Sequence, residues 1–228
     1  MDKQKINFFF SRAARHYDHY AWLPQDLAAR LLRLVSSGRQ KPKNILDIGC
    51  GTGTLAFSLS KRFKPAKVIG FDLASGMVQV AKGRKDKPEP VFLRADLEKI
   101  PFKADTFDMV ISNSVYQRSR NLQTAFRKVN RILIYGGKFY LSIITRGTLR
   151  ELQSSFMRAC KKRMKSYPVV AYRHPQICEV IKALKNSGFI VMQTATYKKM
   201  RYYSSAAEII KWLKSIGDNA AKFASAPD

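Results

Sequence analysis

The chain of 228 residues is 46% hydrophobic, and its 42 Lys and Arg against 16 Asp and Glu give a formal net charge of +26. This length allows one domain with a sizeable core, and the three cysteines are spaced too widely for a disulfide framework or a cysteine zinc site. No apolar run reaches the roughly 18 residues that span a bilayer, and the N-terminal apolar patch is too short for a secretion signal, so we expect a cytoplasmic protein with no membrane contact.

The first 40 residues predict two helices. One runs from Phe10 to about Tyr20, and the second starts near Pro24, where leucines at helical spacing precede Ser36-Ser37-Gly38. We expect these helices to form a lid over a core that begins near residue 41.

Strand-like and helix-like segments alternate between residues 41 and 145. The predicted strands are Ile45 to Asp47, Lys67 to Asp72, Pro90 to Leu93, Phe107 to Ser112, and Lys138 to Ile144 after a turn at Gly136-Gly137. Helical stripes separate them, and one of these helices is expected from Ser75 to Gly83. This order predicts the α/β class, with a doubly wound, mostly parallel sheet and helices on both faces.

The last part of the chain, residues 146–228, is less regular. We predict a basic helix from Thr148 to Lys165, a helix from Pro175 to Lys185, a sixth strand from Phe189 to Tyr197, and a last helix that carries Ile209, Ile210, Leu213 and Ile216. The whole chain would then be one domain, with a helical lid (1–40), a cofactor-binding core (41–145) and a substrate-side part (146–228).

A glycine loop follows the first predicted strand. Gly49-Cys50-Gly51-Thr52-Gly53 leads into a helix, and its glycines let the backbone turn sharply and approach a ligand closely. Asp72 ends the second strand about 20 residues later, where an acid can accept hydrogen bonds from both ribose hydroxyls. Loop, acid and strand order together predict a site for a nucleoside-containing cofactor.

Asp47 distinguishes among such cofactors. It stands two residues before Gly49, where a buried acid would repel a pyrophosphate but suits the positively charged amino acid end of S-adenosylmethionine. The loop also has the GxGxG spacing, not the GxGxxG of dinucleotide sites. We therefore predict an S-adenosylmethionine site.

Four segments resemble the motifs of class I S-adenosylmethionine-dependent methyltransferases. They are Ile45 to Gly53, the ribose-binding Phe71 to Met77, the adenine-contacting Ala95 to Phe102, and Thr106 to Asn113, whose end borders the transferred methyl group in that family. The resemblance implies a Rossmann-like fold, with Asp96 holding the adenine amine. The cofactor contacts that it implies are Asp47, Gly49, Cys50, Gly51, Gly53, Asp72, Leu73, Met77, Asp96, Leu97 and Asn113.

Other segments resemble a narrower family, the malonyl-acyl-carrier-protein O-methyltransferases of biotin synthesis. Phe10 to Ala14, with Tyr17 and Asp18 after it, is similar to their N-terminal helix, and Leu213 to Gly217 is similar to their last helix. This resemblance implies that the methyl acceptor is the free carboxylate of a malonyl thioester on acyl carrier protein.

Two features depart from that family. Its members usually finish with a seventh, antiparallel strand, whereas this sequence ends soon after Gly217, so we expect the sheet to lack that strand unless Lys198 to Tyr203 doubles back. Arg118 stands beside Gln117, where the family often has an apolar aromatic residue. The family's acceptor contacts are therefore not carried over at that position.

A carboxylate acceptor is ionised at neutral pH and needs no general base. We therefore predict no catalytic residue and no metal, and expect the enzyme to act by positioning its reactants. Tyr17, Asn113 and Gln117 are candidates to line the acceptor pocket. Arg146 and Arg173 are candidates to pair with the acceptor carboxylate, although a solvated surface position is the commoner role for such arginines.

The charge of +26 leaves the partner open. A basic surface would speed the encounter with an acidic carrier protein, and it would also attract RNA, or it can reflect a lysine-rich composition alone. The alternatives are a small-molecule or quinone C- or O-methyltransferase, an RNA-associated methyltransferase, and a non-catalytic binding protein on a methyltransferase scaffold.

Overall fold

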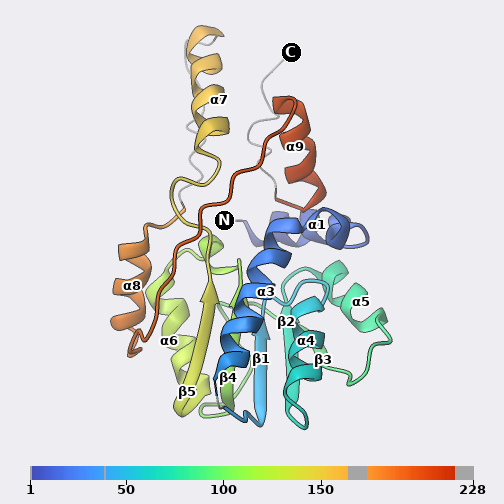
Figure 1. Ribbon diagram of the computed structural model, residues 1–228, viewed down its shortest axis with the longest axis vertical. Coiled ribbons are helices and arrows are strands. Elements are labelled where there is room, and N and C mark those ends of the chain that lie inside the picture. Colours follow the sequence, from blue (N-terminus) through green and yellow to red (C-terminus); the bar gives the residue numbers. More distant parts are fainter. Residues whose placement is uncertain (1, 39, 164–173, 219–228) are drawn as a thin grey trace.

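The computed structural model describes residues 2–38, 40–163 and 174–218. Within them, five strands form one parallel sheet in the order β3-β2-β1-β4-β5 (Figure 1). The strands are β1 (Asn44–Ile48), β2 (Lys67–Asp72), β3 (Val91–Arg94), β4 (Phe107–Asn113) and β5 (Leu133–Ser142). The predicted α/β class and doubly wound parallel sheet are confirmed, and the strand order reverses between β1 and β4.

Helices cover both faces of the sheet. Successive residues of a strand point to opposite faces, and both sets are apolar. The first face carries α3 (Trp22–Ser37), α4 (Thr54–Arg62) and α5 (Ser75–Gly83), and the second carries α6 (Leu122–Ile132) and α8 (Ile177–Lys185). Ile45 and Met109 pack into the first interface and Leu46 and Val110 into the second, and all four are fully buried. Parallel strands covered in this way have near-continuous apolar sequences.

The remaining helices gather beyond the carboxyl ends of the strands (Figure 1). They are α1 (Lys3–Ala13), α2 (Tyr17–Tyr20), the short 3-10 helix η1 (Tyr116–Arg118), α7 (Arg150–Arg163) and α9 (Ala206–Ser215). Ala21, Leu213 and Ile216 form a small buried cluster between α9 and the N-terminal helices. None of the helices in the described ranges is long and apolar enough to cross a membrane.

The N-terminal segment forms two helices where the sequence predicted one from Phe10 to Tyr20. α1 starts earlier because the Asp2 carboxylate accepts a hydrogen bond from the Gln4 N–H at 2.9 Å and caps the helix. The chain then turns at Ala14, which packs against Met77 of α5, before α2 begins. The turn brings the N-terminal helices close to the sheet.

The predicted sixth strand, Phe189 to Tyr197, is wrong. Residues 189–204 run from α8 to α9 and pair with no strand in the described structure (Figure 1). Phe189 packs on Phe139 of β5 with ring centroids 5.5 Å apart, but Ile190 and Met192 are each 86% exposed. A β-prone sequence forms a strand only where its backbone finds a neighbour, and side-chain contacts draw this segment away from the sheet.

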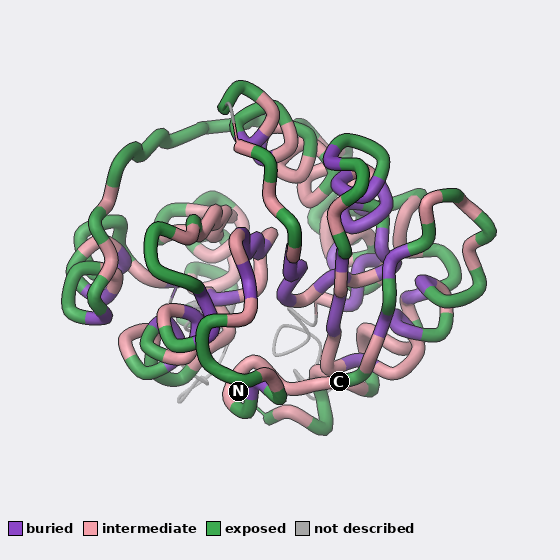
Figure 2. Tube along the Cα trace, turned by 90° about the horizontal axis from the view of Figure 1, so that it is seen from below, coloured by how far each residue is buried: buried purple, intermediate pink, exposed green. Residues whose placement is uncertain are grey.

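Those contacts lie on α3, and residues 189–204 are called the strap below. Tyr197 lies under the guanidinium of Arg30, 4.1 Å from its ring centroid, and Lys199 pairs with Asp26 at 3.1 Å. Arg201 lies 4.9 Å from the Trp22 ring. The strap is the long exposed arc in Figure 2, and it carries the chain from the side of the sheet to α9.

β5 begins at Leu133, five residues before the predicted start at Lys138. Leu133 pairs with Phe107, and the register then shifts so that Lys138 pairs with Met109. Gly136 lies in this irregularity with φ +75°, so the glycines form a bulge within the strand instead of the predicted turn before it. The predicted bounds of β2 and α5 are confirmed.

Candidate cofactor and acceptor site

A pocket opens where the carboxyl ends of β1, β2 and β4 meet, beside α1, α2 and η1. This is the point at which the strand order reverses, where doubly wound sheets leave a crevice. Most of the predicted cofactor residues line it together: Gly49, Gly51, Asp72, Leu73, Met77, Asp96, Leu97 and Asn113. The other three, Asp47, Cys50 and Gly53, are not in its lining.

The glycine loop has a left-handed backbone at three positions. Gly49, Gly51 and Gly53 have φ values of +71°, +54° and +85°. A Cβ at Gly49 would lie 2.2 Å from a methyl group of Val115, and one at Gly53 would lie 2.7 Å from the Phe92 ring, whereas Gly51 faces open space. Gly49 and Gly53 thus allow tight packing, and Gly51 leaves room for a ligand.

Asp72 lies at the end of β2 with its carboxylate against the loop. Oδ2 accepts a hydrogen bond from Gly51 N–H at 3.0 Å, and Oδ1 accepts one from Ala74 N–H at 2.8 Å. Burial raises the pKa of Asp72, and these backbone donors act against that rise. Each carboxylate oxygen has a further lone pair, so the fixed carboxylate can also accept hydrogen bonds from ribose hydroxyls.

Two predicted residues, Asp47 before the loop and Cys50 within it, are buried. Asp47 is 1% exposed, and its Oδ2 has no hydrogen-bond partner among the described residues. Burial and the nearby charge of Asp72 raise the pKa of Asp47 to about 7. Burial also raises the pKa of the Cys50 thiol, which makes it unreactive. A buried carboxyl group with one unpartnered oxygen, two residues before Gly49 of the pocket lining, fits a positively charged ligand.

Asp96 bounds another part of the pocket. Its Oδ1 accepts a hydrogen bond from Glu98 N–H at 2.8 Å, and its Oδ2 pairs with Lys3 of α1 at 2.6 Å. Burial alone would raise the pKa of Asp96, but these two contacts lower it. Nothing in the sequence indicated Lys3, because its approach depends on how α1 packs in three dimensions.

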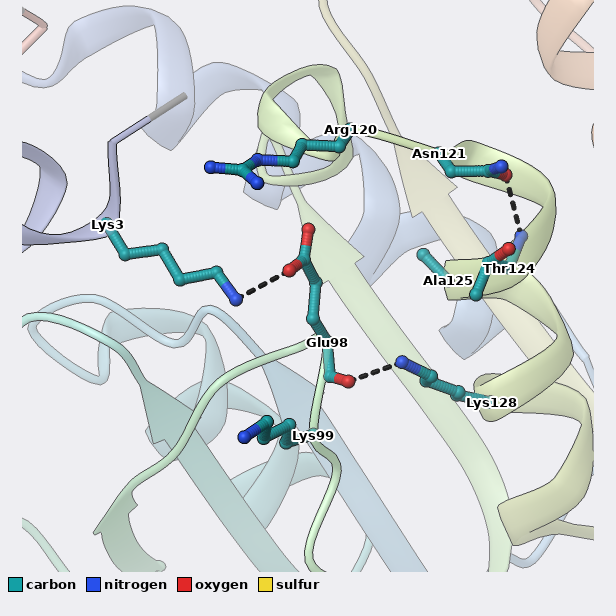
Figure 3. Close-up of a pocket in the computed structure, with 8 residues that line it drawn as sticks. All are labelled: Lys3, Glu98, Lys99, Arg120, Asn121, Thr124, Ala125 and Lys128. Carbon is teal, nitrogen blue, oxygen red and sulfur yellow. Dashed lines mark hydrogen bonds and ion pairs between the residues drawn. The ribbon is translucent and has the colours of Figure 1, made fainter.

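A second cavity lies beside this ion pair (Figure 3). Its lining consists of Lys3, Glu98, Lys99, Arg120, Asn121, Thr124, Ala125 and Lys128. Lys3 also pairs with Glu98 at 2.5 Å, and Lys128 donates a hydrogen bond to the Glu98 carbonyl. Among the described residues, none of those predicted for the cofactor or the acceptor lies in this cavity.

Tyr17 lines the main pocket from α2. Burial raises the pKa of its phenol, so the side chain stays neutral at physiological pH. The next residue fastens α2 to the core, because Asp18 accepts a hydrogen bond from Thr52 Oγ1 at 2.6 Å and pairs with Arg84. The N-terminal helices thus contact the glycine loop directly.

Asn113 and Gln117 have different places. Asn113 lines the pocket, donates a hydrogen bond to the Pro24 carbonyl at 2.9 Å and accepts one from Ser142 Oγ at 2.5 Å. It therefore ties the start of α3 to the ends of β4 and β5. Gln117 does not line the pocket, because its amide turns back to donate to the Ser114 carbonyl at 2.7 Å.

Of the two arginines predicted to guide the acceptor, the structure describes only Arg146, and it does not line the pocket. Arg146 is exposed, and its N–H donates to the Pro175 carbonyl at 3.0 Å, while Arg173 lies outside the described residues. Arg118 lines the pocket instead. In the sequence, Arg118 stood out only because the related family often has an aromatic residue at that position. That difference was the one sign that Arg118 belongs to the site.

The pocket is built to position reactants. Leu73, Met77 and Leu97 give it apolar walls, and Asp72 gives it a fixed hydrogen-bond acceptor. No histidine lies in its described lining. These groups fit S-adenosylmethionine, which supplies an activated methyl group when bound, and the protein's own part is to orient the two reactants and exclude water.

The parallel sheet with its reversal of strand order between β1 and β4, the glycine loop and the acids at the strand ends define a class I S-adenosylmethionine-dependent methyltransferase. A family model described as "Methyltransferase domain" matches residues 46–141. This range runs from β1 to β5 and contains the loop, Asp72 and Asp96. S-adenosylmethionine is therefore the cofactor.

Relatives that match along the whole chain narrow this class. The chain is 32% identical to the malonyl-[acyl-carrier protein] O-methyltransferase of Herminiimonas arsenicoxydans, over 100% of this chain and 82% of that protein. It is 30% identical to the enzyme of the same name from Geobacter sulfurreducens, over 95% of this chain and 82% of that protein. An S-adenosylmethionine-dependent methyltransferase from Thermotoga maritima shares the fold, with a TM-score of 0.59 and 19% identity over 81% of each chain. The chain belongs to the malonyl-[acyl-carrier protein] O-methyltransferase family.

Proposed function

We propose that this enzyme methylates the free carboxylate of a malonyl thioester carried by acyl carrier protein, as a step in biotin synthesis. The observation that carries the proposal is the similarity, over nearly the whole chain, to two relatives named for this activity. The proposed contacts of the cofactor are the predicted residues that line the pocket, with Asp72 on the ribose and Asp96 at the adenine, and the buried Asp47 acts on the cofactor through its charge. The proposal includes a cytoplasmic location, because its acceptor travels on a soluble carrier.

The composition of the pocket supports a carboxylate acceptor. A carboxylate oxygen attacks the methyl carbon, the carbon–sulfur bond breaks, and the electron pair stays on sulfur. No proton has to move, so the absence of a histidine from the described lining is no obstacle. Tyr17 and Asn113 would bound the place where the acceptor meets the methyl group.

The surface near the pocket supports an acidic carrier. α7 and α9 lie beyond the carboxyl ends of the strands (Figure 1), and their exposed residues include the basic Arg150, Arg158, Lys161, Lys211 and Lys214. Acyl carrier proteins are acidic, so these helices would attract one and bring its thioester arm towards the pocket.

Transfer of labelled methyl groups tests the proposal. The protein is incubated with methyl-labelled S-adenosylmethionine and, in separate reactions, malonyl-carrier protein, acetyl-carrier protein, a quinone precursor or total RNA. We expect label in the malonyl-carrier protein and none above background in the acetyl form, which lacks the free carboxylate. Label only in RNA or only in the quinone precursor would show that the proposed acceptor is wrong. The Asp72→Asn variant, which alters the cofactor site, is the control.

A further inference from the structure

Arg118 is the arginine in the described lining of the pocket. It ends η1, directly after β4, and its side chain is 15% exposed. The guanidinium lies 4.8 Å from the centroid of the Phe10 ring, and Nη2 lies 3.2 Å from Asp218 Oδ1. Phe10 and Asp218, from opposite ends of the chain, therefore hold the guanidinium in place. Arg118 and Tyr17 both line the pocket.

The end of α9 is shaped to make this contact. Gly217 has φ +68°, and a Cβ there would lie 3.0 Å from the Cα of Phe10. A residue with a side chain would be strained in this conformation and would push α9 away from α1. Asp218 follows Gly217 directly, so the close approach of the glycine places the Asp218 carboxylate against Arg118.

The described neighbours of Arg118 include two carboxylates, Asp218 in an ion pair and Asp72 near enough for the charge of Arg118 to lower its pKa. Tyr17 is neutral at physiological pH, and burial lowers the pKa of His174, which faces Asp218 and Arg118, so this histidine is neutral as well. Lys3, the other cation that lines the pocket, is paired with two carboxylates. A guanidinium has five N–H donors in a planar fork, so it can hold Asp218 and a second carboxylate together.

We infer that Arg118 binds the free carboxylate of the methyl acceptor and that Asp218 positions Arg118 to do so. The inference rests on the proposed function. One carboxylate oxygen stays on the guanidinium while the other forms a bond to the methyl carbon, and the departing sulfur keeps the electron pair. The ester that results carries no charge, so it loses its ion pair with Arg118 and is released more readily than the acceptor.

Binding of two thioesters that differ by a carboxylate tests the inference. Calorimetry with saturating S-adenosylhomocysteine compares malonyl-coenzyme A with acetyl-coenzyme A, for the wild type, Arg118→Gln and Arg127→Gln. Arg127 is exposed on α6, so its variant removes the same charge outside the pocket. We expect the wild type and Arg127→Gln to prefer malonyl-coenzyme A by about 10- to 100-fold, and Arg118→Gln to lose that preference.

Affinity for S-adenosylhomocysteine separates the inference from its main rival. If Arg118→Gln weakens the binding of S-adenosylhomocysteine as much as that of malonyl-coenzyme A, Arg118 holds the cofactor's own carboxylate and the inference is overturned. The inference is also overturned if Arg118→Gln keeps the malonyl preference. The proposed function would still hold in that case if the wild type methylates malonyl thioesters. If the wild type has no malonyl preference, both fail.

Two further variants keep the test decisive if Arg118→Gln does not fold. Arg118→Lys keeps the charge without the planar fork, and we expect it to retain part of the malonyl preference. Asp218→Asn leaves Arg118 in place without its ion pair, and we expect KM for the malonyl thioester to rise about 3- to 10-fold with kcat little changed. A lower melting temperature with an unchanged malonyl-to-acetyl ratio in both variants would give these residues a structural role only.

Discussion

Asp47 is a buried acid whose charge state should depend on the cofactor. Burial and the nearby charge of Asp72 raise the pKa of Asp47 to about 7, so near neutral pH part of the molecules hold it protonated. The cofactor carries a sulfonium and an ammonium group, both of which favour the ionised carboxylate. Binding should therefore lower the pKa of Asp47 and release a proton.

The affinity for S-adenosylmethionine should consequently depend on pH. Below pH 7 the free protein holds Asp47 mostly protonated, and ionising it opposes binding, so affinity should rise by about tenfold from pH 6 to pH 8 and then level off. Calorimetric titration at several pH values measures this. Asp47→Asn has no proton to lose, so its affinity should be flat over the same range. An equal slope in that variant would assign the pH dependence to another group.

Asp72 offers a second test at the level of single residues. Asp72→Asn should weaken binding of S-adenosylhomocysteine by about 1–3 kcal/mol, or about 5- to 150-fold, because the amide replaces one hydrogen-bond acceptor with a donor. Calorimetry gives the dissociation constant. Asp86→Asn is the matched control, since Asp86 is on the surface and pairs with Lys61. Equal dissociation constants for Asp72→Asn and Asp86→Asn would show that Asp72 does not contact the ribose.

Single residues differ in how far the sequence predicts their place. Asp72 and the loop glycines were predicted, because strand ends and glycine spacing are local properties of the chain. Lys3 and Arg118 were not predicted, because Lys3 reaches the pocket only through the packing of α1, and Arg118 is held by contacts with Phe10 and Asp218 that are distant in the sequence. Arg146 was predicted for the acceptor but is exposed, since its place after β5 fixes its backbone without fixing the direction of its side chain.

At the level of elements, α9 packs against the N-terminal helices. Trp212 fastens it, because its ring stacks on Trp22 with centroids 5.5 Å apart and its indole N–H donates to the Tyr20 carbonyl at 2.8 Å. The cluster of Ala21, Leu213 and Ile216 completes the contact. Asp218 follows α9 and pairs with Arg118 of the pocket lining, so the position of α9 affects the position of Arg118.

Removing the Trp212 ring should therefore loosen α9. Trp212→Ala should destabilise the protein by about 1–3 kcal/mol and lower the melting temperature by about 3–10 °C. Limited proteolysis should then cut first in the strap or at α9. Lys211→Ala, an exposed neighbour on the same helix, should melt with the wild type, and coincident melting curves for both variants would show that Trp212 does not hold the helix.

The strap explains why the sequence predicted most elements but not the sixth strand. β1, β2 and β4 are apolar segments that the sheet buries, and their pattern alone identifies them. Phe189 to Tyr197 has similar residues, but a strand also needs a partner backbone, which no propensity supplies. The contacts of Tyr197 with Arg30 and of Lys199 with Asp26 determine its course.

At the scale of the whole molecule, the net charge of +26 should act on the encounter with the acceptor. Raising NaCl from 50 to 500 mM should lower kcat/KM for malonyl-carrier protein by about tenfold or more, because salt screens attraction between opposite charges. kcat at saturating carrier protein should change less than twofold, since the chemistry occurs inside the pocket. Steady-state kinetics give both numbers. A parallel fall in kcat would point to salt acting on the fold or the cofactor instead.

The chemical nature of the product shows whether the methyl acceptor is a carboxylate. Carrier protein methylated with labelled S-adenosylmethionine is treated with mild base, and volatile label is collected. A carboxyl methyl ester is hydrolysed under these conditions, so the account predicts that the label leaves as methanol and that the malonyl group, analysed by mass spectrometry before treatment, carries one added methyl group. Label that remains non-volatile after base treatment, on the carrier protein or on an acid released from it, would contradict this expectation, because it would mean that the methyl group had been placed on carbon or nitrogen.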